Sequence, residues 1–196
     1  IEGLAEWGGV SKESTVFVLG AGTNLLIDDR GFGGLVIHPK IKFIKKQDSF
    51  LRVGSGVLIE NLLAFCIENS LSGLEWAGGL PGTLGGAVAG NAGAFRGEIK
   101  DAIVQIVSIA NIANREGNFA IKTRNKKECH FGYRNSIFKT NPNEIIISAT
   151  LKLQKGDKKL IQEKTEEKIN YRREKHPLEY PNIGSIFKNI PLEKVP

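Results

Sequence analysis

Residues 73–97 read GLEWAGGLPGTLGGAVAGNAGAFRG and are almost free of charged side chains. Nine of these 25 residues are glycine and five are alanine, and the only charges are Glu75 and Arg96. A flexible linker or a solvated loop would be richer in serine or in charge. Closely spaced glycines instead let bare backbone lie against a flat or anionic partner. The stretch therefore predicts contact with a bound cofactor, and the alternative is a tight glycine-packed turn between core elements.

Composition predicts a globular chain with a proper core. The chain has 196 residues, of which 41% are hydrophobic, enough for one large domain or two small lobes. No apolar run approaches the length of a membrane span, and residues 1–11 lack the pattern of a secretory signal. We expect a cytoplasmic monomer that has no membrane partner. Because the chain starts at Ile1 without methionine and stops at Pro196, we expect a fragment of a longer protein.

Neither a metal site nor a disulfide is predicted. Cys66 and Cys129 stand in no CxxC spacing, and Cys66 falls on the apolar face of a predicted helix, which favours a reduced core thiol. His38, His130 and His176 have no metal-ligand spacing among them. We interpret the histidines as structural or rim residues.

The positive net charge does not predict a nucleic-acid partner. Lysine and arginine number 27 against 21 acidic residues, which gives +6. Between residues 152 and 175 the two signs are interleaved, without the interspersed aromatic residues of a single-strand binder. This segment is typical of a solvated helix face.

A second glycine turn follows an apolar segment near the start of the chain. Residues 15–20, TVFVLG, predict a strand buried on both faces. The turn after it begins like a dinucleotide fingerprint, but Leu25 replaces the third glycine and no helix start follows, which disfavours an ordinary Rossmann unit. No GK[ST] sequence for a nucleoside triphosphate is present. Backbone N–H groups, the Thr23 hydroxyl and the Asn24 amide could hold phosphate oxygens there. The alternative is a hairpin turn with Asn24 in a left-handed conformation.

The remaining periodicity predicts alternating strands and helices. Strands are expected at residues 34–38, 50–53, 102–109 and 144–153. An amphipathic helix is expected at 58–69 and a charged helix at 158–173, ended by His176 and Pro177.

Four segments, in order, resemble the UDP-N-acetylenolpyruvoylglucosamine reductase (UDP-N-acetylmuramate dehydrogenase) family. They are LGAGTNLLIDDRGFGGLVI from Leu19, the glycine stretch from Gly73, CHFGYRNSIFK from Cys129, and YPNIGSIFKN from Tyr180. The resemblance covers nearly the whole chain. Its departures are Thr23 in place of a frequent serine, Gly90 in place of a frequent methionine, and Ile190 inserted before Pro191.

The resemblance implies an α+β fold with a two-lobed FAD-binding domain of the vanillyl-alcohol oxidase and p-cresol methylhydroxylase (PCMH) type. That domain would span residues 1–157, with lobes at 1–40 and 41–157, and residues 158–196 would begin an incomplete C-terminal substrate-binding α+β domain. The implied FAD-binding residues are Gly20, Ala21, Gly22, Thr23, Asn24, Leu25, Pro81, Gly82, Thr83, Gly85, Gly86, Asn91, Ala92, Gly93 and Ala94.

The resemblance also implies a reaction in peptidoglycan precursor synthesis. NADPH reduces FAD, and the flavin N5 passes hydride to C3 of UDP-N-acetylglucosamine enolpyruvate. Arg134 would hold the enolate oxygens that develop, and Ser185 would give a proton to C2. Tyr133, Lys188 and Asn189 would contact this UDP-sugar substrate. The family's third catalytic residue, a glutamate, is expected beyond Pro196, so we expect weak or absent flavin binding and negligible turnover from this chain alone.

Two other hypotheses stay open. One is an FAD-dependent oxidoreductase of the same fold acting on an alcohol or a phenol, many of which tether flavin through His or Cys, residues that both glycine segments lack. The other is a basic nucleic-acid-binding or scaffold module, suggested only by the net charge.

Overall fold

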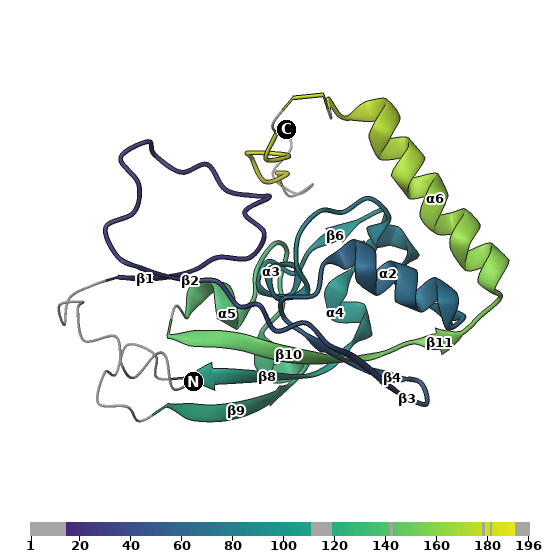
Figure 1. Ribbon diagram of the computed structural model, residues 1–196, viewed down its shortest axis with the longest axis horizontal. Coiled ribbons are helices and arrows are strands. Elements are labelled where there is room, and N and C mark those ends of the chain that lie inside the picture. Colours follow the sequence, from purple (N-terminus) through teal and green to yellow (C-terminus); the bar gives the residue numbers. More distant parts are fainter. Residues whose placement is uncertain (1–14, 111–118, 142, 178, 181, 191–196) are drawn as a thin grey trace.

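A five-stranded antiparallel sheet forms the base of the protein (Figure 1). The structure is a computed structural model and describes residues 15–110, 119–141, 143–177, 179–180 and 182–190. The sheet contains β3 (Ile44–Gln47), β4 (Phe50–Gly54), β8 (Ile103–Ala110), β9 (Ala120–Asn125) and β10 (Glu144–Lys152). Their order is β3-β4-β10-β8-β9, so the longest strand, β10, lies in the middle. The strands predicted at 50–53, 102–109 and 144–153 are confirmed.

Short helices cover one side of this sheet (Figure 1). They are α2 (Ile59–Glu68), α3 (Leu84–Ala89), α4 (Ile99–Ala102) and α5 (Ile137–Thr140). The apolar stripe of α2 buries Ile59, Leu62, Leu63 and Cys66, which confirms the helix predicted at 58–69. These side chains join Leu51, Ile106 and Leu151 of the sheet in one core. The described part of the chain contains no helix long and apolar enough to cross a membrane.

Within the described residues, the predicted first lobe contains a two-stranded parallel sheet. Strand β1 (Val16–Val18) pairs with β2 (Leu35–Ile37), and residues 19–34 join them as an open loop (Figure 1). The expectation that residues 15–20 form a strand buried on both faces is wrong, because Val18 is exposed and Val16 and Phe17 are half-buried. The hairpin alternative is also wrong, since the two strands run parallel and the left-handed residue is Gly22. Residues 1–14 of the predicted lobe lie outside the described residues.

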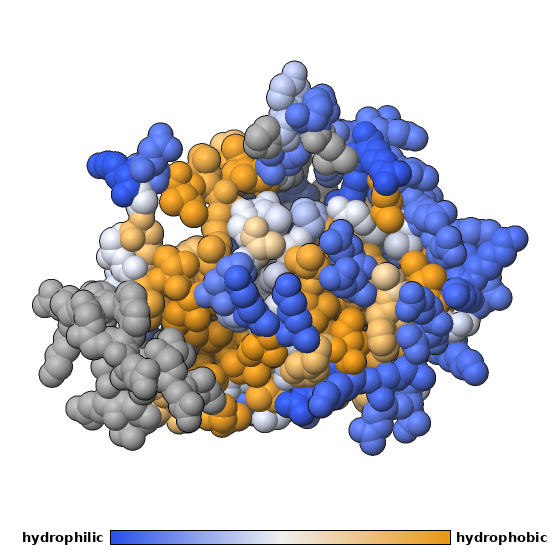
Figure 2. Space-filling view, in the orientation of Figure 1, coloured by the Kyte–Doolittle hydropathy of each residue, from blue (hydrophilic) through white to orange (hydrophobic). Residues whose placement is uncertain are grey.

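A long charged helix packs on the helical side of the molecule. The helix α6 (Lys158–Lys175) begins at the Asp157 cap and ends before His176, as the sequence predicts. It follows β11 (Gln154–Lys155), which pairs with β5 (Leu71–Ser72), and it contacts α2 and the 3-10 turn η1 (Glu75–Ala77). Polar side chains gather over this part of the surface in Figure 2. Only Ile161 and Thr165 of α6 are buried. The domain boundary at residue 157 stays a prediction.

The glycine stretch itself is folded into short pieces. After η1 come α3, the two-residue strands β6 (Gly93–Ala94) and β7 (Gly97–Glu98), and then α4. A further 3-10 turn, η2 (Lys127–Cys129), precedes the CHFGYRNS segment.

Both cysteines are free thiols in buried positions, where the loss of solvation raises the pKa of Cys66 to about 12 and that of Cys129 to about 11.

Candidate functional site

The two glycine turns lie side by side although about 60 residues separate them in the sequence. A Cβ atom at Gly20 would lie 3.0 Å from Thr83 Oγ1, and one at Gly82 would lie 3.1 Å from Thr23 Oγ1. Gly22 and Gly82 have φ angles of 74° and 114°, a region that side chains disfavour. The structure therefore brings together the two segments that the sequence analysis assigned to one cofactor.

Hydrogen bonds fix the second turn to the segment between β4 and α2. The Leu84 N–H donates to Val57 O and the Ile59 N–H donates to Gly82 O, each at 2.8–3.0 Å. Thr83 Oγ1 accepts from the Gly86 N–H and so caps α3. Gly85 serves packing, because a Cβ there would meet the Ser55 side chain at 3.0 Å. This scaffold holds the turn in one place before any ligand binds.

Exposed backbone surrounds the point where the turns meet. Ala21, Gly22, Thr23 and Asn24 are exposed, as are Pro81 and Gly86, while Leu25 and Gly20 are half-buried. Thr83 is buried. Short side chains and open N–H groups of this kind suit the oxygens of a pyrophosphate. No group of three potential metal ligands occurs among the described residues.

The sequence analysis assigned Asn91 to the cofactor, but its side chain forms hydrogen bonds that hold two loops together. It is fully buried, donates to Gly132 O at 2.9 Å and accepts from the Lys100 N–H at 3.3 Å. The neighbouring Ser136 hydroxyl donates to Ala89 O at 2.7 Å. Ala92 bonds backbone to backbone with Ala87 and Ile99. These contacts tie the glycine stretch to the turn that carries Tyr133 and Arg134.

Arg134 stands at the tip of a tight turn in a strained conformation. Gly132 and Asn135 exchange backbone hydrogen bonds of 3.0 and 3.2 Å around it, and its own φ is 54°. Glycine or asparagine usually occupies such a position. Left-handed arginine costs about 1 kcal/mol or more, and such residues concentrate at functional sites. The guanidinium lies 5.5 Å from the Tyr133 ring centre.

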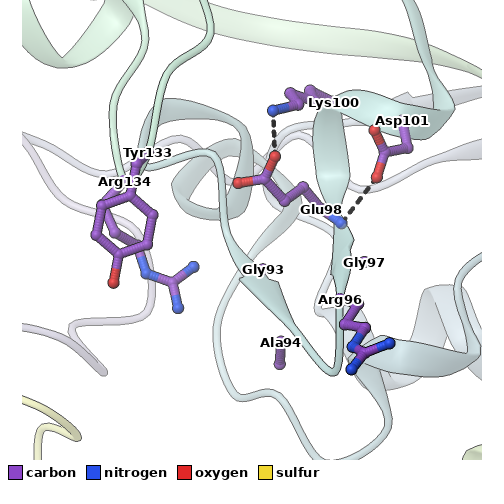
Figure 3. A pocket seen from close by; sticks show the side chains of 9 residues that line it. All are labelled: Gly93, Ala94, Arg96, Gly97, Glu98, Lys100, Asp101, Tyr133 and Arg134. Carbon is purple, nitrogen blue, oxygen red and sulfur yellow. Dashed lines mark hydrogen bonds and ion pairs between the residues drawn. The ribbon is translucent and has the colours of Figure 1, made fainter. Parts of the chain in front are cut away.

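Arg134 opens onto a hollow of about 440 Å³ (Figure 3). The hollow is lined by Gly93, Ala94, Arg96, Gly97, Glu98, Lys100, Asp101, Tyr133 and Arg134. A Cβ at Gly93 would lie 2.8 Å from Glu98 Cγ and 3.5 Å from a terminal nitrogen of Arg134. Glycine at position 93 is therefore what allows β6 and β7 to pair this closely, while a side chain there would reach van der Waals contact with the guanidinium.

Sequence reasoning missed Gly97 and four charged residues that line this hollow. Arg96, Glu98, Lys100 and Asp101 were not among the predicted site residues. Lys100 forms an ion pair with Glu98, and Asp101 accepts from the Glu98 N–H at 3.0 Å. The available signal was Arg96, one of only two charges within the glycine stretch.

The segment after α6 returns over α3 and β6 in Figure 1 and touches the Arg134 turn. The Asn189 N–H donates to the Tyr133 hydroxyl at 3.4 Å. Ser185 and Lys188 are exposed, and neither makes a side-chain hydrogen bond to a described residue. The structure thus brings Asn189 to Tyr133 but gives no contact between Ser185 and Arg134. Their catalytic roles stay predictions.

The FAD-binding domain family matches residues 10–120, which include both glycine turns. The chain belongs to this family. The α+β FAD-binding fold expected from the sequence is confirmed. A solved structure, UDP-N-acetylenolpyruvylglucosamine reductase from Thermus caldophilus, aligns with a TM-score of 0.73 at 29% identity, over 91% of this chain and 62% of that one. A solvent-stable cholesterol oxidase, at 16% identity and a TM-score of 0.52, shares the fold alone.

Curated relatives confirm the resemblance to the reductases. The chain is 40% identical over 173 residues to UDP-N-acetylenolpyruvoylglucosamine reductase of Clostridium tetani, which covers 88% of this chain and 54% of that protein. It is 41% identical over 174 residues to the protein of the same name from Lactobacillus delbrueckii, covering 88% of this chain and 56% of that protein. The chain spans about half the length of the curated relatives it matches.

Proposed function

We propose that this chain is the FAD-binding part of an NADPH-dependent UDP-N-acetylenolpyruvoylglucosamine reductase. Convergence of the Gly20 and Gly82 turns is the observation that carries the proposal. The paired turns suit a dinucleotide pyrophosphate, and Arg134, whose turn is tied to the same glycine stretch, suits a substrate that develops negative charge. The reaction would supply UDP-N-acetylmuramate for peptidoglycan.

The residues present fit FAD. A Cβ atom at Gly20 or Gly82 would crowd the threonine hydroxyl of the other turn, so the absence of Cβ at both positions lets the two turns lie this close. Ala21, Gly22, Thr23 and Asn24 would hold the cofactor through exposed backbone N–H and hydroxyl groups, while Pro81 and Gly86 would contact it without donating a backbone hydrogen bond. FAD bound there would take hydride from NADPH and deliver it to C3 of the enolpyruvyl group.

Arg134 would stabilise the charge that appears when C3 accepts hydride. Its planar guanidinium can donate two hydrogen bonds to the carboxylate oxygens on which an enolate develops. The left-handed backbone and the Gly132–Asn135 hydrogen bonds fix its position in advance. A preorganised donor of this type stabilises a transition state by about 3 kcal/mol.

Ser185 would give a proton to C2, and Tyr133, Lys188 and Asn189 would contact the UDP-sugar. Serine is a weak acid, but a carbanion next to a carboxylate is a strong base, so a hydroxyl within hydrogen-bond reach suffices. The contact of Asn189 with Tyr133 supports a shared site for the two segments. Ser185 would have to approach the Arg134 turn when the substrate binds.

Absorbance between about 350 and 500 nm, measured after adding FAD, tests the cofactor assignment. A protein as long as the curated relatives that shows no flavin band at saturating FAD contradicts it. Flavin that stays attached after acid precipitation would favour the alternative oxidase acting on an alcohol or a phenol. Negligible turnover by this chain alone stays a prediction and is checked with NADPH and the enolpyruvyl sugar.

We expect Arg134→Ala, in a protein as long as the curated relatives, to keep FAD and to lose turnover by about 100- to 1,000-fold. Ser185→Ala should likewise keep FAD and lose turnover. The substrate-induced change in the flavin spectrum gives a second readout, which Arg134→Ala should weaken. Arg52→Ala, at an exposed position of strand β4, is the matched control and should leave both readouts unchanged. Unchanged turnover in Arg134→Ala would remove the proposed role.

We also propose that the protein acts in the cytoplasm as a monomer, without nucleic-acid or membrane partners. The support is the chemistry of the substrates, since nucleotide sugars and reduced nicotinamide nucleotides are made and held in that compartment. Sedimentation of the purified protein and fractionation of cells test these two statements.

A further inference from the structure

The β6–β7 hairpin turns through two bulky residues in left-handed conformations. Ala94 pairs with Gly97, and the two residues between them, Phe95 and Arg96, have φ angles of 49° and 66°. A two-residue turn with both φ angles positive is usually built from asparagine and glycine. Here the turn instead presents one aromatic and one basic side chain.

Phe95 anchors the turn on α6. Its ring meets Tyr171 edge-on at 5.2 Å, and Lys168 and Arg172 place their charges 5.0 and 5.3 Å from its centre. Arg172 is itself fixed, because its Nε donates to Gly78 O at 2.8 Å. With Phe95 held on one side, Arg96 is directed to the other side, where it lines the hollow that also contains Arg134.

Among the described residues that line this hollow, Arg96 and Arg134 are the basic side chains that form no ion pair. Three basic and two acidic side chains line it, and Lys100 is paired with Glu98 while Asp101 caps the Glu98 backbone. Among the described residues neither Arg96 nor Arg134 forms an ion pair. Figure 3 shows them on opposite sides of Gly93 and Ala94. A ligand lying over these small residues would meet a guanidinium at each end.

We infer that Arg96 is a second anion-binding residue of this site and takes a phosphate group of a nucleotide ligand, while Arg134 faces the reacting end. The inference rests on the proposed function and extends it to a residue outside the predicted site. An exposed guanidinium binds phosphate through paired, charge-assisted hydrogen bonds. The phosphate belongs either to the diphosphate of the UDP-sugar or to the 2′-phosphate of NADPH.

Calorimetric titration of a protein as long as the curated relatives, at saturating FAD, tests this inference, with uridine diphosphate, NADP⁺ and NAD⁺ as probes. Arg96→Gln removes the charge, and Arg96→Gly removes the side chain at a φ angle that glycine adopts freely, so this variant keeps the fold. We expect both to bind one phosphate probe about tenfold more weakly and to bind FAD as before. Arg96→Lys should restore part of the affinity.

The probes separate the two sources of phosphate. Weaker uridine diphosphate binding assigns Arg96 to the sugar nucleotide, whereas a lost preference for NADP⁺ over NAD⁺ assigns it to the nicotinamide nucleotide. Arg52→Gln carries the same change in net charge on strand β4 and should alter neither. Unchanged binding of every probe in the Arg96 variants, or no probe binding by the FAD-loaded parent protein, overturns the inference. Failure to bind FAD at all would instead contradict the proposed function.

Discussion

At the scale of single residues, a buried carboxylate shows how the sheet holds its shape beside the site. The Glu144 side chain has no exposed surface and accepts two hydrogen bonds of 2.8 Å from Arg124 on β9 and one of 2.6 Å from Ser108 on β8. Burial alone would raise the pKa of Glu144. The hydrogen bonds from Arg124 and Ser108 outweigh burial, and the pKa lies below its ordinary value of 4.5.

This lowered pKa predicts an acid-sensitive contribution to stability. A carboxyl group whose pKa falls on folding stabilises the protein above its ordinary pKa, and the contribution is lost as the pH falls through the folded pKa. Glu144→Gln should cost about 2–3 kcal/mol at pH 7, because it leaves the Arg124 charge without its partner, and the difference should shrink below about pH 4.

Urea unfolding of both proteins between pH 7 and pH 3 measures this effect. Glu163→Gln, on the exposed face of α6 with Lys159 at 3.9 Å, is the control and should change stability by less than about 0.5 kcal/mol. A difference between Glu144→Gln and the parent that stayed constant down to pH 3 would contradict the assignment.

At the scale of elements, the sequence of helix α6 predicts that the helix forms but not where it packs. Charge of both signs along its length predicts a solvated helix, and its existence and ends are confirmed. The close packing of α6 on the core depends on Gly78, a residue outside the helix that has no side chain. A Cβ at Gly78 would lie 2.3 Å from Thr165 O. Nothing in the α6 sequence points to this contact, because it depends on where η1 lies.

Gly78→Ala should therefore displace α6. The φ angle at this position is −50°, which alanine accepts, so the effect comes from the clash alone. We expect a loss of about 1–3 kcal/mol, as for other overpacked contacts, and faster hydrogen exchange along α6 than along β10. Gly90→Ala is the matched control, since its Cβ would lie 3.6 Å from the nearest atom, Gly86 O. Equal stability of the two variants would show that α6 adapts freely.

Other elements escaped sequence analysis for an equally physical reason. Strands β3 (IKKQ) and β9 (AIKTRN) lie at the two edges of the sheet and expose most of their side chains, so no apolar alternation marks them. Helix α3 (LGGAVA) contains two glycines that disfavour a helix, and it forms because Thr83 caps it and Leu84 and Val88 are buried. In both cases tertiary contacts decide what local preference leaves open.

At the scale of the whole molecule, the site is assembled from segments that only the fold brings together. Sequence resemblance predicted that the Gly20 and Gly82 turns share a ligand, and their proximity agrees with that expectation. The resemblance could not find Arg96, because its role depends on Phe95 docking against α6. Nor could it show that the Asn91 amide is buried between two loops. Motifs predict which segments meet, while packing decides which side chains remain free.

Convergence of the two turns makes Gly82→Ala the sharpest test of the cradle. The φ angle of 114° disfavours any side chain, and the new methyl group would lie 3.1 Å from Thr23 Oγ1, so the backbone at residue 82 is strained and the Thr23 side chain must shift by a few tenths of an ångström. We expect FAD affinity to fall at least tenfold, or about 1.4 kcal/mol, measured by absorbance titration. Gly33→Ala lies in the same loop as Thr23, meets no atom within 4 Å and has no left-handed φ, so FAD affinity should stay unchanged. Equal affinity in the two variants would mean that FAD does not bind between these turns, and a loss in Gly33→Ala alone would place it along the outer part of the 19–34 loop.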